Sequence, residues 1–363
     1  MKKLTILILA LFAINYVYSQ EYFASVKKGN QWGFIKEDGM WVVNPQFDQV
    51  KEFHEGIAAV RSDGKWGFIY RTGLYAIEPQ FDMVKTFRVG LAPVKMGKLW
   101  GFINRNSHMI VNPQFRSAKI FKDGMACVED KNGFGYIDMT GTFVIDPQFD
   151  NASSFSEGMA AVYVEKKWGY IDNIGNWIIQ PQFEEAKDFQ NGFAMVKMNA
   201  KWGYINRSGN YAIYPQFQEA EVFSESAAPV KVEDDWGFVD KSGNFLINPQ
   251  FEAVKTYKEG VVAVLKDGKW KFVNKSGKYQ FKLSFEKVRS FHEGVAAVKK
   301  DKKWGFVDQN GNWIIYPQYD QVGDFKHGRT IIKKEGLWGW INKKGEILIE
   351  PRFTKVSPFA KVR

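Results

Sequence analysis

The chain has 363 residues, of which 45% are apolar and 25% are charged. This balance excludes a disordered chain, and the apolar residues suffice for a large core. Trp, Tyr and Phe make up 16% of the residues, whereas there are one Cys and four His. These counts exclude a disulfide-stapled scaffold and a Cys-rich metal domain. The formal net charge of +10 permits an anionic partner without requiring one.

Residues 1–19 predict a secretory signal peptide. Two Lys residues follow the initial Met, an apolar stretch runs to about Tyr16, and we expect cleavage before Gln20. The alternative is an uncleaved membrane anchor, but the stretch is short for a span of about 20 residues and Asn15 interrupts it. We therefore expect an exported protein, located in the periplasm, on the cell surface or in the medium, with no transmembrane segment after cleavage. Cleavage removes two Lys and no acid, which leaves a net charge of +8.

The mature chain, residues 20–363, is organised as one array of ten repeats. Trp recurs every 34 residues without insertion or deletion, and Phe134 replaces it in one repeat. Gly follows this aromatic residue in every repeat except one, where Lys271 takes its place, and nine of the 12 Pro share one column. A fixed period of this kind predicts a single array in which each unit is stabilised by its neighbours. The Trp column comprises Trp32, Trp66, Trp100, Trp168, Trp202, Trp236, Trp270, Trp304 and Trp338.

Each repeat predicts three short antiparallel strands and a packed connection. In the second repeat, residues 58–60 begin one strand and residues 66–69 return as the next, joined by the two-residue hairpin signal Asp63-Gly64. Residues 75–77 form the third strand, and Pro79 is expected to end it because proline cannot donate to a strand ladder. We expect the segment after Pro79 to be a loop or a short strand.

Two Gly columns carry separate expectations. Trp66 and Phe68 share one strand face while Gly67 lies on the other, so Gly67 indicates a close approach of another backbone segment. The second Gly column closes an Asx-x-x-Gly pattern, of which Asp138 is one example, and this pattern is typical of a type I turn. The turn explains the Asx column better than calcium binding does, because the dense spacing of a calcium loop is missing. The Trp column favours core packing over a set of sugar-stacking platforms.

Ten equal β units can form a closed, propeller-like ring or an open β-solenoid. Residues 23–26 and residues 359–362 both resemble the first strand of a unit. A ring closed by strand exchange would need complementary ends rather than two copies of one strand. We therefore expect an all-β tandem array of ten 34-residue antiparallel β units, with the open solenoid favoured and the ring as the alternative.

The repeated pattern resembles the WG-repeat family. It contains Lys-Trp-Gly-Phe-Ile at residues 65–69, then Asx-x-x-Gly, Pro-Gln-Phe-Asp and Phe-x-x-Gly-x-Ala-x-Val. The eighth repeat departs most, with Lys271 after its Trp and Leu283 in the Pro column. The resemblance covers the whole mature chain and implies a bacterial binding module or scaffold without a common catalytic activity.

No residue set predicts an active site, a metal centre or a cofactor. His54 and His292 occupy the same repeat position but lie seven repeats apart, and no His pair has metal-ligand spacing. No Ser, His and Asp set and no phosphate-binding Gly loop stands out. Cys127 is expected to be a small buried side chain rather than a reactive thiol. We therefore expect a protein that is not an enzyme.

Two columns of basic residues are the candidate binding sites. In an array, each column forms a stripe, and like charges along a stripe repel unless they are solvated or meet an anionic partner. The first column follows the Ala-x-Val strand and comprises Lys27, Arg61, Lys95, Lys197, Lys231, Lys299 and Lys333. The second column comprises Lys51, Lys85, Lys119, Lys187, Lys255 and Arg289.

The function expected from these features is that of an exported, non-enzymatic repeat protein that presents an extended surface for protein binding. The alternative is a surface protein that binds carbohydrate or another polyanion, for example an anionic glycan. Nucleic acid is not expected as a partner of an exported protein. Aromatic side chains at variable, outward-facing positions would favour the carbohydrate alternative.

Overall fold

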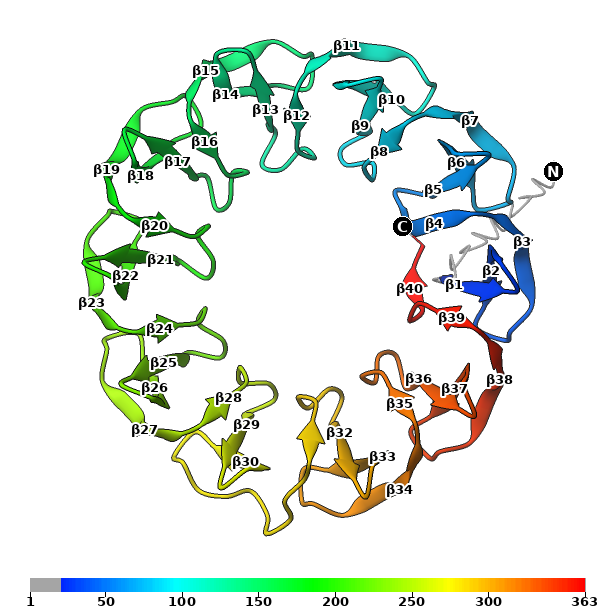
Figure 1. The fold of residues 1–363 in the computed structure, drawn as a ribbon, viewed down its shortest axis with the longest axis vertical. Coiled ribbons are helices and arrows are strands. Elements are labelled where there is room, and N and C mark those ends of the chain that lie inside the picture. Colours follow the sequence, from blue (N-terminus) through cyan, green and yellow to red (C-terminus); the bar gives the residue numbers. More distant parts are fainter. Residues whose placement is uncertain (1–20, 363) are drawn as a thin grey trace, which may run out of the picture.

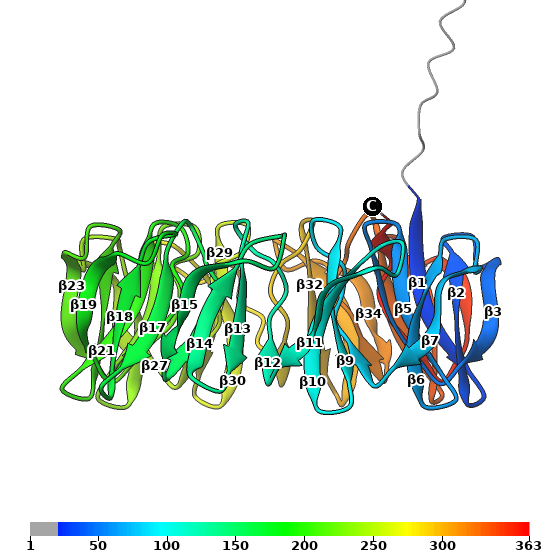
Figure 2. The same cartoon turned by 90° about the horizontal axis from the view of Figure 1, so that it is seen from above.

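The computed structural model describes residues 21–362, so the predicted signal peptide at residues 1–19 lies outside the described part. Ten antiparallel sheets stand side by side as the blades of a closed ring (Figure 1). Figure 2 shows the ring from its edge, as a disc whose strands run between its two rims. The protein is thus a ten-bladed β-propeller. The expectation of an all-β tandem array is confirmed, whereas the favoured open solenoid is wrong.

Eight blades contain four strands in radial order, from an innermost strand next to the ring axis to a long strand at the periphery, whereas blade 1 has five strands and blade 8 has three. The innermost strands are β4 (Gln49–His54), β8 (Met83–Val84), β12 (Ser117–Ala118), β16 (Asn151–Ala152), β20 (Glu185–Ala186), β24 (Glu219–Ala220), β28 (Ala253–Val254), β31 (Lys287–Val288), β35 (Gln321–Val322) and, in blade 1, β39 (Lys355–Val356) with β40 (Ala360–Lys361). The second strands are β1 (Tyr22–Lys28), β5 (Ile57–Ser62), β9 (Leu91–Met96), β13 (Ala126–Asp130), β17 (Ala160–Val164), β21 (Phe193–Met198), β25 (Ala228–Val232), β29 (Val261–Lys266), β32 (Val295–Lys300) and β36 (Arg329–Lys334).

The second, third and outer strands are given in the order of blades 1 to 10, whereas the innermost strands above begin with blade 2 and end with blade 1. The third strands are β2 (Gln31–Lys36), β6 (Lys65–Tyr70), β10 (Leu99–Asn104), β14 (Gly133–Ile137), β18 (Lys167–Ile171), β22 (Lys201–Asn206), β26 (Asp235–Val239), β30 (Lys269–Asn274), β33 (Lys303–Asp308) and β37 (Leu337–Asn342). The outer strands are β3 (Trp41–Phe47), β7 (Tyr75–Phe81), β11 (Met109–Phe115), β15 (Phe143–Phe149), β19 (Trp177–Phe183), β23 (Tyr211–Phe217), β27 (Phe245–Phe251), β34 (Trp313–Tyr319) and β38 (Ile347–Phe353). Blade 8 has no outer strand in its described residues.

The two predicted turns are present. Asp63 and Gly64 have φ values of 49° and 79°, as the favoured two-residue hairpin turn requires. In the Asx turn, Asp138 Oδ1 accepts hydrogen bonds from the backbone N–H groups of Thr140 at 2.8 Å and Thr142 at 3.0 Å. The Asx column therefore stabilises the connection between the third and outer strands.

The predicted close approach at Gly67 is confirmed, but the expectation that Pro79 ends the third predicted strand is wrong. Strand β7 continues through Pro79 to Phe81, and its register with β6 shifts at this point. The resulting bulge places the Ile77 carbonyl and the Pro79 nitrogen against Gly67, where a Cβ atom would lie 2.6 Å from the nitrogen. The bulge accommodates a proline without a missing ladder bond and leaves space for glycine alone.

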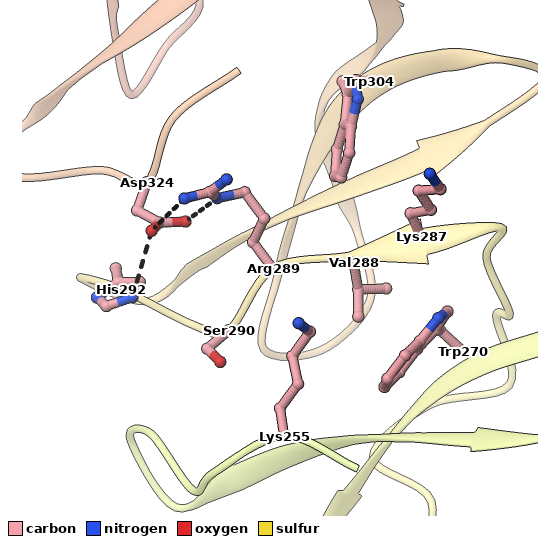
Figure 3. A pocket seen from close by; sticks show the side chains of 9 residues that line it. All are labelled: Lys255, Trp270, Lys287, Val288, Arg289, Ser290, His292, Trp304 and Asp324. Atoms are coloured by element: carbon pink, nitrogen blue, oxygen red, sulfur yellow. Dashed lines mark hydrogen bonds and ion pairs between the residues drawn. The ribbon is translucent and has the colours of Figure 1, made fainter. Parts of the chain in front are cut away.

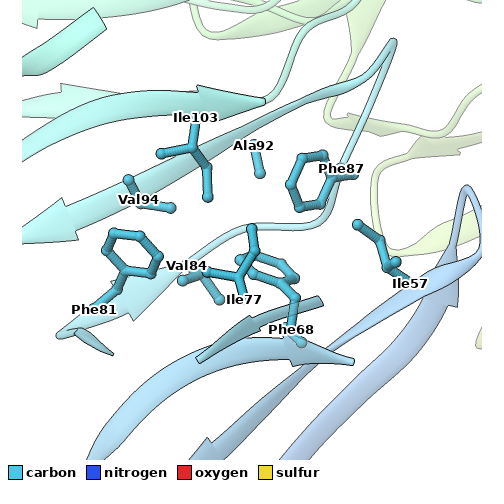
Figure 4. Packing of buried hydrophobic residues seen from close by; sticks show 10 residues of the cluster. Ile57, Phe68, Ile77, Phe81, Val84, Phe87, Ala92, Val94 and Ile103 are labelled. Carbon is cyan, nitrogen blue, oxygen red and sulfur yellow. The ribbon is translucent and has the colours of Figure 1, made fainter. Parts of the chain in front are cut away.

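The hydrophobic core lies between the blades rather than inside each one. At the junction of blades 2 and 3, Phe68 and Ile77 of blade 2 pack against Val94 and Ile103 of blade 3 (Figure 4). Phe87, which follows the innermost strand of blade 3, meets Phe68 edge-on with ring centroids 4.8 Å apart. Burial of each such ring contributes about 1.5–3 kcal/mol. Every junction of the ring contains an equivalent ring pair, so each blade is covered by its two neighbours.

The two ends of the described chain close the ring. Strand β39 pairs with β1 through Val26 and Val356, and β40 pairs with the start of the same strand. Phe359 and Trp340 pack with Ala24 in the cluster between blades 10 and 1. The open solenoid was favoured because both ends resembled one strand. The short strand supplied by residues 355–356 is the missing innermost strand of blade 1, and it makes the ends complementary.

Within the described residues 21–362, no helix has the length and apolar character needed to cross a membrane.

Candidate functional site

The surface nearest the ring axis is formed by ten equivalent four-residue segments, which we call the inner wall. The connections that contain these segments project toward the axis (Figure 1). The third residue of each segment, such as Phe53, is a buried aromatic residue that anchors the segment to the inter-blade core. The inner wall comprises residues 51–54, 85–88, 119–122, 153–156, 187–190, 221–224, 255–258, 289–292, 323–326 and 357–360.

The ten segments of the inner wall contain ten Lys or Arg residues and four Asp or Glu residues. The turn residue that follows each segment adds six acids, so the excess of positive charge is confined to particular blades. These acids are Glu55, Asp123, Glu157, Glu225, Glu259 and Glu293. The segments of blades 3 and 4 carry Lys85, Arg88, Lys119 and Lys122 and no acid, and we call these four residues the basic arc. Arg88 and Lys122 are exposed, whereas Lys85 and Lys119 are half-buried. Charges of one sign that line a concave surface concentrate oppositely charged partners there.

The second basic column forms part of this wall and also joins the blades. Lys51 Nζ donates a hydrogen bond of 2.6 Å to the carbonyl of Val84 in the next blade, and its ammonium group lies 5.2 Å from the centre of the Trp66 ring. Burial, followed by the nearby charge of Lys85, lowers the pKa of Lys51. The stem of this lysine therefore covers a Trp while its charge bridges two blades.

The other members of the second column vary this arrangement. Lys85 and Lys119 make the same inter-blade bond, at 2.7 and 2.8 Å. Lys187 and Lys255 lie over the Trp rings of their own blades at 5.5 and 5.4 Å. Arg289 instead reaches the next blade through a carboxylate, as described below. The structure thus places these six residues on one ring-shaped surface, as the repeat predicts.

The first basic column lies one strand farther from the axis. Each of its seven residues is half-buried and is paired in register with the Trp of the third strand, as Lys197 is with Trp202. Lys197 also pairs with Glu185 at 2.9 Å, and Lys231 pairs with Glu219 at 3.0 Å. Its members are Lys27, Arg61, Lys95, Lys197, Lys231, Lys299 and Lys333. This column therefore flanks the Trp rings, most of which are half-buried at the margin of the inter-blade core.

A hollow of about 540 Å³ opens in the inner wall between blades 8 and 9 (Figure 3). Arg289 donates two hydrogen bonds to the Asp324 carboxylate of blade 10, from Nε at 2.5 Å and from Nη2 at 2.9 Å. These bonds raise the pKa of Arg289. His292 Nε2 lies 3.7 Å from the same carboxylate. The residues that line the hollow are Lys255, Trp270, Lys287, Val288, Arg289, Ser290, His292, Trp304 and Asp324.

A second hollow, of about 800 Å³, adjoins the first and extends over blade 10 to the closing segment. In other blades, an inner-wall lysine covers the Trp ring of its own blade. Gly323 occupies this position in blade 10, so no lysine side chain at this position covers Trp338. Ile331 and Phe359 add apolar surface to this hollow, and Glu52 reaches it from blade 2. The hollow thus combines apolar and charged groups, a mixture that suits ligand or peptide binding.

Sequence reasoning singled out Lys255 and Arg289 in these hollows but missed Gly323 and Asp324. Gly323 breaks its repeat column, in which a basic residue is common, whereas the column of Asp324 varies and also holds Asp188. A search for departures from the repeat, rather than for its common residues, would have found Gly323 but not Asp324. In the described chain, no group of three or more His, Cys, Asp and Glu residues is arranged to hold a metal ion.

The buried Cys127 agrees with the sequence-based expectation. Its side chain is 2% exposed, and burial raises the pKa of the thiol to about 11. Its Sγ atom lies 3.7 Å from the carbonyl oxygen of Ala152 in the next blade. This thiol therefore belongs to the packing between blades 4 and 5 rather than to the inner wall.

Solved structures with a similar fold share little sequence with this chain. A crystal structure titled as the eukaryotic initiation factor superposes with a TM-score of 0.55 at 9% identity, covering 94% of this chain and 98% of that one. Dihydro-heme d1 dehydrogenase NirN, solved with DHE, gives a TM-score of 0.38 at 12% identity, covering 75% of each chain. Hsv2p of Kluyveromyces lactis gives 0.31 at 12% identity, covering 75% of this chain and 96% of that one. The first similarity shows a shared fold alone, and the other two are too weak to carry an argument.

No curated protein matches the sequence. A family model described as "WG containing repeat" matches ten consecutive segments, at residues 32–66, 66–100, 100–133, 134–168, 168–202, 202–234, 236–270, 272–304, 304–338 and 338–361. These matches cover nearly the whole described chain at the spacing of the Trp column. The chain therefore belongs to the WG-repeat family.

Proposed function

We propose that this protein is an exported, non-catalytic interaction scaffold whose inner wall binds an acidic segment of a protein partner. The observation that carries the proposal is the basic arc, where the inner-wall segments of two neighbouring blades carry four Lys or Arg residues and no acid. A β-propeller of ten mutually supporting blades offers a rigid surface, which limits the entropy lost on binding. Acidic residues of a partner would form ion pairs that steer and orient it.

The basic arc is the proposed centre of this interface. Arg88 and Lys122 are exposed on neighbouring blades, and their four-residue segments contain no acid. In the turns that follow, the Glu55 carboxylate is engaged by the backbone of Val89 and Gly90, and Asp123 is adjacent to Lys122. Lys85 and Lys119 add charge from half-buried positions. Burial lowers the pKa of Lys85, and the neighbouring charge of Lys119 lowers it further. An acidic partner would relieve this repulsion between like charges.

The non-catalytic part of the proposal rests on the groups in the deeper hollows. Asp324 is an acid of the hollow between blades 8 and 9, and Arg289 already engages both of its carboxylate oxygens. An acid held in this way is suited to positioning neighbouring blades rather than to exchanging protons with a substrate.

Export is proposed from residues 1–19, whose basic start and apolar stretch suit a signal peptide. N-terminal sequencing of the protein recovered outside the cytoplasm should begin at Gln20. An intact N-terminus on that protein would contradict cleavage.

The binding proposal is tested with the mature protein and a polyglutamate peptide, by titration calorimetry. The double substitution Arg88→Gln and Lys122→Gln should weaken binding between about 2-fold and about 30-fold, since each exposed ion pair contributes about 0.2–1 kcal/mol. Raising the NaCl concentration from about 0.1 M to about 1 M should weaken wild-type binding, because the screening length falls from about 10 Å to about 3 Å.

The matched control removes two charges from the opposite rim of the same blades. Lys98 and Lys131 are exposed in the hairpin turns of blades 3 and 4, so Lys98→Gln with Lys131→Gln changes the net charge equally. An equal loss in both double variants would contradict a specific role of the basic arc. Binding of a polyuronate but not of the peptide would overturn the protein partner in favour of an anionic glycan.

A further inference from the structure

Two tyrosines on the outer strands break the repeat pattern in the same column. Tyr214 on β23 and Tyr316 on β34 are 71% and 70% exposed. The strands that carry them lie at the periphery of the ring, in blades 6 and 9 (Figure 1). In the other eight repeats this column holds a polar or charged residue, namely Asn44, Glu78, Asn112, Asp146, Gln180, Asn248, Lys282 and Glu350. The fold therefore does not require an aromatic residue at this position.

Each tyrosine lies on a second aromatic ring that fixes its orientation. Tyr316 stacks on Trp313 with ring centroids 5.7 Å apart and an interplanar angle of 23°. Tyr214 stacks on Tyr211 at 4.7 Å and 29°. The partner rings are half-buried at the edge of the blade. Each pair therefore presents a preoriented aromatic platform to solvent, which reduces the entropy lost when a ligand stacks on it.

Polar groups surround the platform of blade 9. Tyr316, Trp313 and Pro317 line a hollow of about 300 Å³ together with Lys300, Asp301 and Lys303. Lys303 also pairs with Asp320 at 2.5 Å, and this ion pair restrains its side chain. The hollow combines one flat apolar face with hydrogen-bonding groups of both signs.

We propose that this platform is a carbohydrate-binding site that takes a pyranose ring. One face of a pyranose presents polarised C–H groups, which pack on the electron-rich face of an aromatic ring. Its hydroxyl groups can donate to the carboxylate of Asp301 and accept from the ammonium group of Lys300. A protein partner fits less well, since a specific interface buries about 800 Å² on each side and one tyrosine supplies about 150–250 Å² at most.

The blade 6 platform is a weaker second site. At the positions of Lys300 and Asp301, blade 6 has Met198 and Asn199, so it offers fewer charged partners for hydroxyl groups. The Tyr211 hydroxyl donates to Met198 Sδ at 3.7 Å, which stabilises the ring below Tyr214. Two sites on one rigid ring would raise the affinity for a long polysaccharide through avidity.

This proposal goes beyond the protein interaction assigned to the inner wall, because the platforms are on the opposite, outer side of the blades. The two proposals are tested with different variants. The substitutions Arg88→Gln and Lys122→Gln should leave polysaccharide binding unchanged, and Tyr316→Asn should leave polyglutamate binding unchanged.

The experiment is affinity electrophoresis of the mature protein in gels that contain a neutral β-glucan, a neutral galactomannan or a polyuronate. At least one polysaccharide should retard the wild type. Tyr316→Asn should weaken this binding about tenfold or more, and Tyr214→Asn should weaken it less. Asn is the residue found at this position in three other repeats, so both variants should keep the wild-type melting temperature.

Tyr70→Asn is the matched control. Tyr70 is 48% exposed and occupies a turn position that holds Asn in four other repeats, but it has no ring stacked on it in the described structure. The control should bind as the wild type does. The proposal is overturned if no polysaccharide retards the wild type, or if Tyr70→Asn weakens binding as much as Tyr316→Asn does. Retardation by a neutral polysaccharide would assign the stacking to the sugar ring, whereas salt-sensitive retardation by the polyuronate alone would contradict it.

Discussion

Blade 2 and blade 8 are built from repeats of equal length, yet blade 2 forms an outer strand and the described residues of blade 8 do not. In blade 2, Gly67 leaves space for the bulge at Pro79. In blade 8, Lys271 stands in the Gly column and Leu283 in the Pro column. A side chain in the Gly column would collide with the bulge, so the two replacements belong together. The comparison shows that Gly and Pro, which are distant in the repeat, form one structural unit.

The loss of the outer strand does not open the core of blade 8. Its outer segment keeps two isolated bridges, Trp270 with Phe285 and Val273 with Tyr279. Phe285 is 2% exposed and belongs to the cluster between blades 8 and 9, as Phe81 does at the junction of blades 2 and 3. Buried aromatic anchors, rather than the outer ladder, therefore hold the segment to the ring.

The strongest test of this comparison removes the anchor from each blade. Phe81→Ala and Phe285→Ala should each lower the free energy of unfolding by about 3–5 kcal/mol, because each leaves a cavity in an inter-blade cluster. Chemical denaturation followed by Trp fluorescence measures both. A cost below about 1 kcal/mol for Phe285→Ala alone would show that the segment depends on the anchor less than we infer.

A second test introduces a side chain into the Gly column. Gly67→Ala should destabilise the protein by about 1–3 kcal/mol, because its Cβ would overlap the Ile77 carbonyl and the Pro79 nitrogen. Lys271→Ala in blade 8 should change stability by no more than about 0.5 kcal/mol, because no bulge faces it. The same denaturation experiment compares them, and equal costs would contradict the coupling of Gly with Pro.

A third test concerns carboxylates that link neighbouring blades. Glu55 accepts hydrogen bonds from the backbone N–H groups of Val89 at 2.6 Å and Gly90 at 3.0 Å, and from Arg105 at 2.7 Å. Burial alone would raise the pKa of Glu55, but the bonds from Arg105 and the two backbone groups lower it below the ordinary value of 4.5. Glu259 makes the corresponding backbone contacts between blades 8 and 9, where a Gln replaces the Arg.

The sign of the pH effect follows from that lowered pKa. Glu55 contributes its full stabilisation above the unfolded pKa of 4.5 and loses it as the pH falls through the lower, folded value. Glu55→Gln should therefore reduce stability by less than about 1 kcal/mol near neutral pH and by progressively less in acid. Thermal unfolding across this range measures the difference, with Glu259→Gln as the control at the other junction. A loss for Glu55→Gln that is independent of pH would contradict the role of its charge.

The smallest effect is expected at Cys127, which reports whether damage in blade 8 spreads through the ring. Its thiol is buried, and burial raises its pKa to about 11. At a pH of about 8.5, the ordinary pKa of Cys, the thiol should therefore not react with a thiol reagent until the protein unfolds. Phe285→Ala should leave this protection intact if the disturbance stays between blades 8 and 9. Rapid labelling of Cys127 in that variant would show that the ring responds as one unit.

Much of the local structure could be predicted from the sequence because it depends on near neighbours in the chain. Asp63-Gly64 and Asp138 specify their turns through positive φ and side-chain hydrogen bonds, and the alternation of Trp66 with Gly67 fixed the strand faces. The bulge at Pro79 was missed, since its space is created by Gly67 on a paired strand. The hollows near Asp324 were missed because they form between blades. The sequence placed the basic residues in two columns, but it did not predict the backbone carbonyls and Trp rings that these side chains contact.

The sequence by itself determined the period, the ten units, the strand faces and the turns, because these follow from residue types and their spacing. Only the tertiary structure decided that the array closes. Each repeat supplies the innermost strand of the following blade, so a repeat in the sequence and a blade in space differ by one strand. Residues 355–356 therefore fit beside Tyr22–Lys28 when ten blades have turned the chain through a full circle. That rotation is set by side-chain packing at ten junctions, which no single repeat encodes.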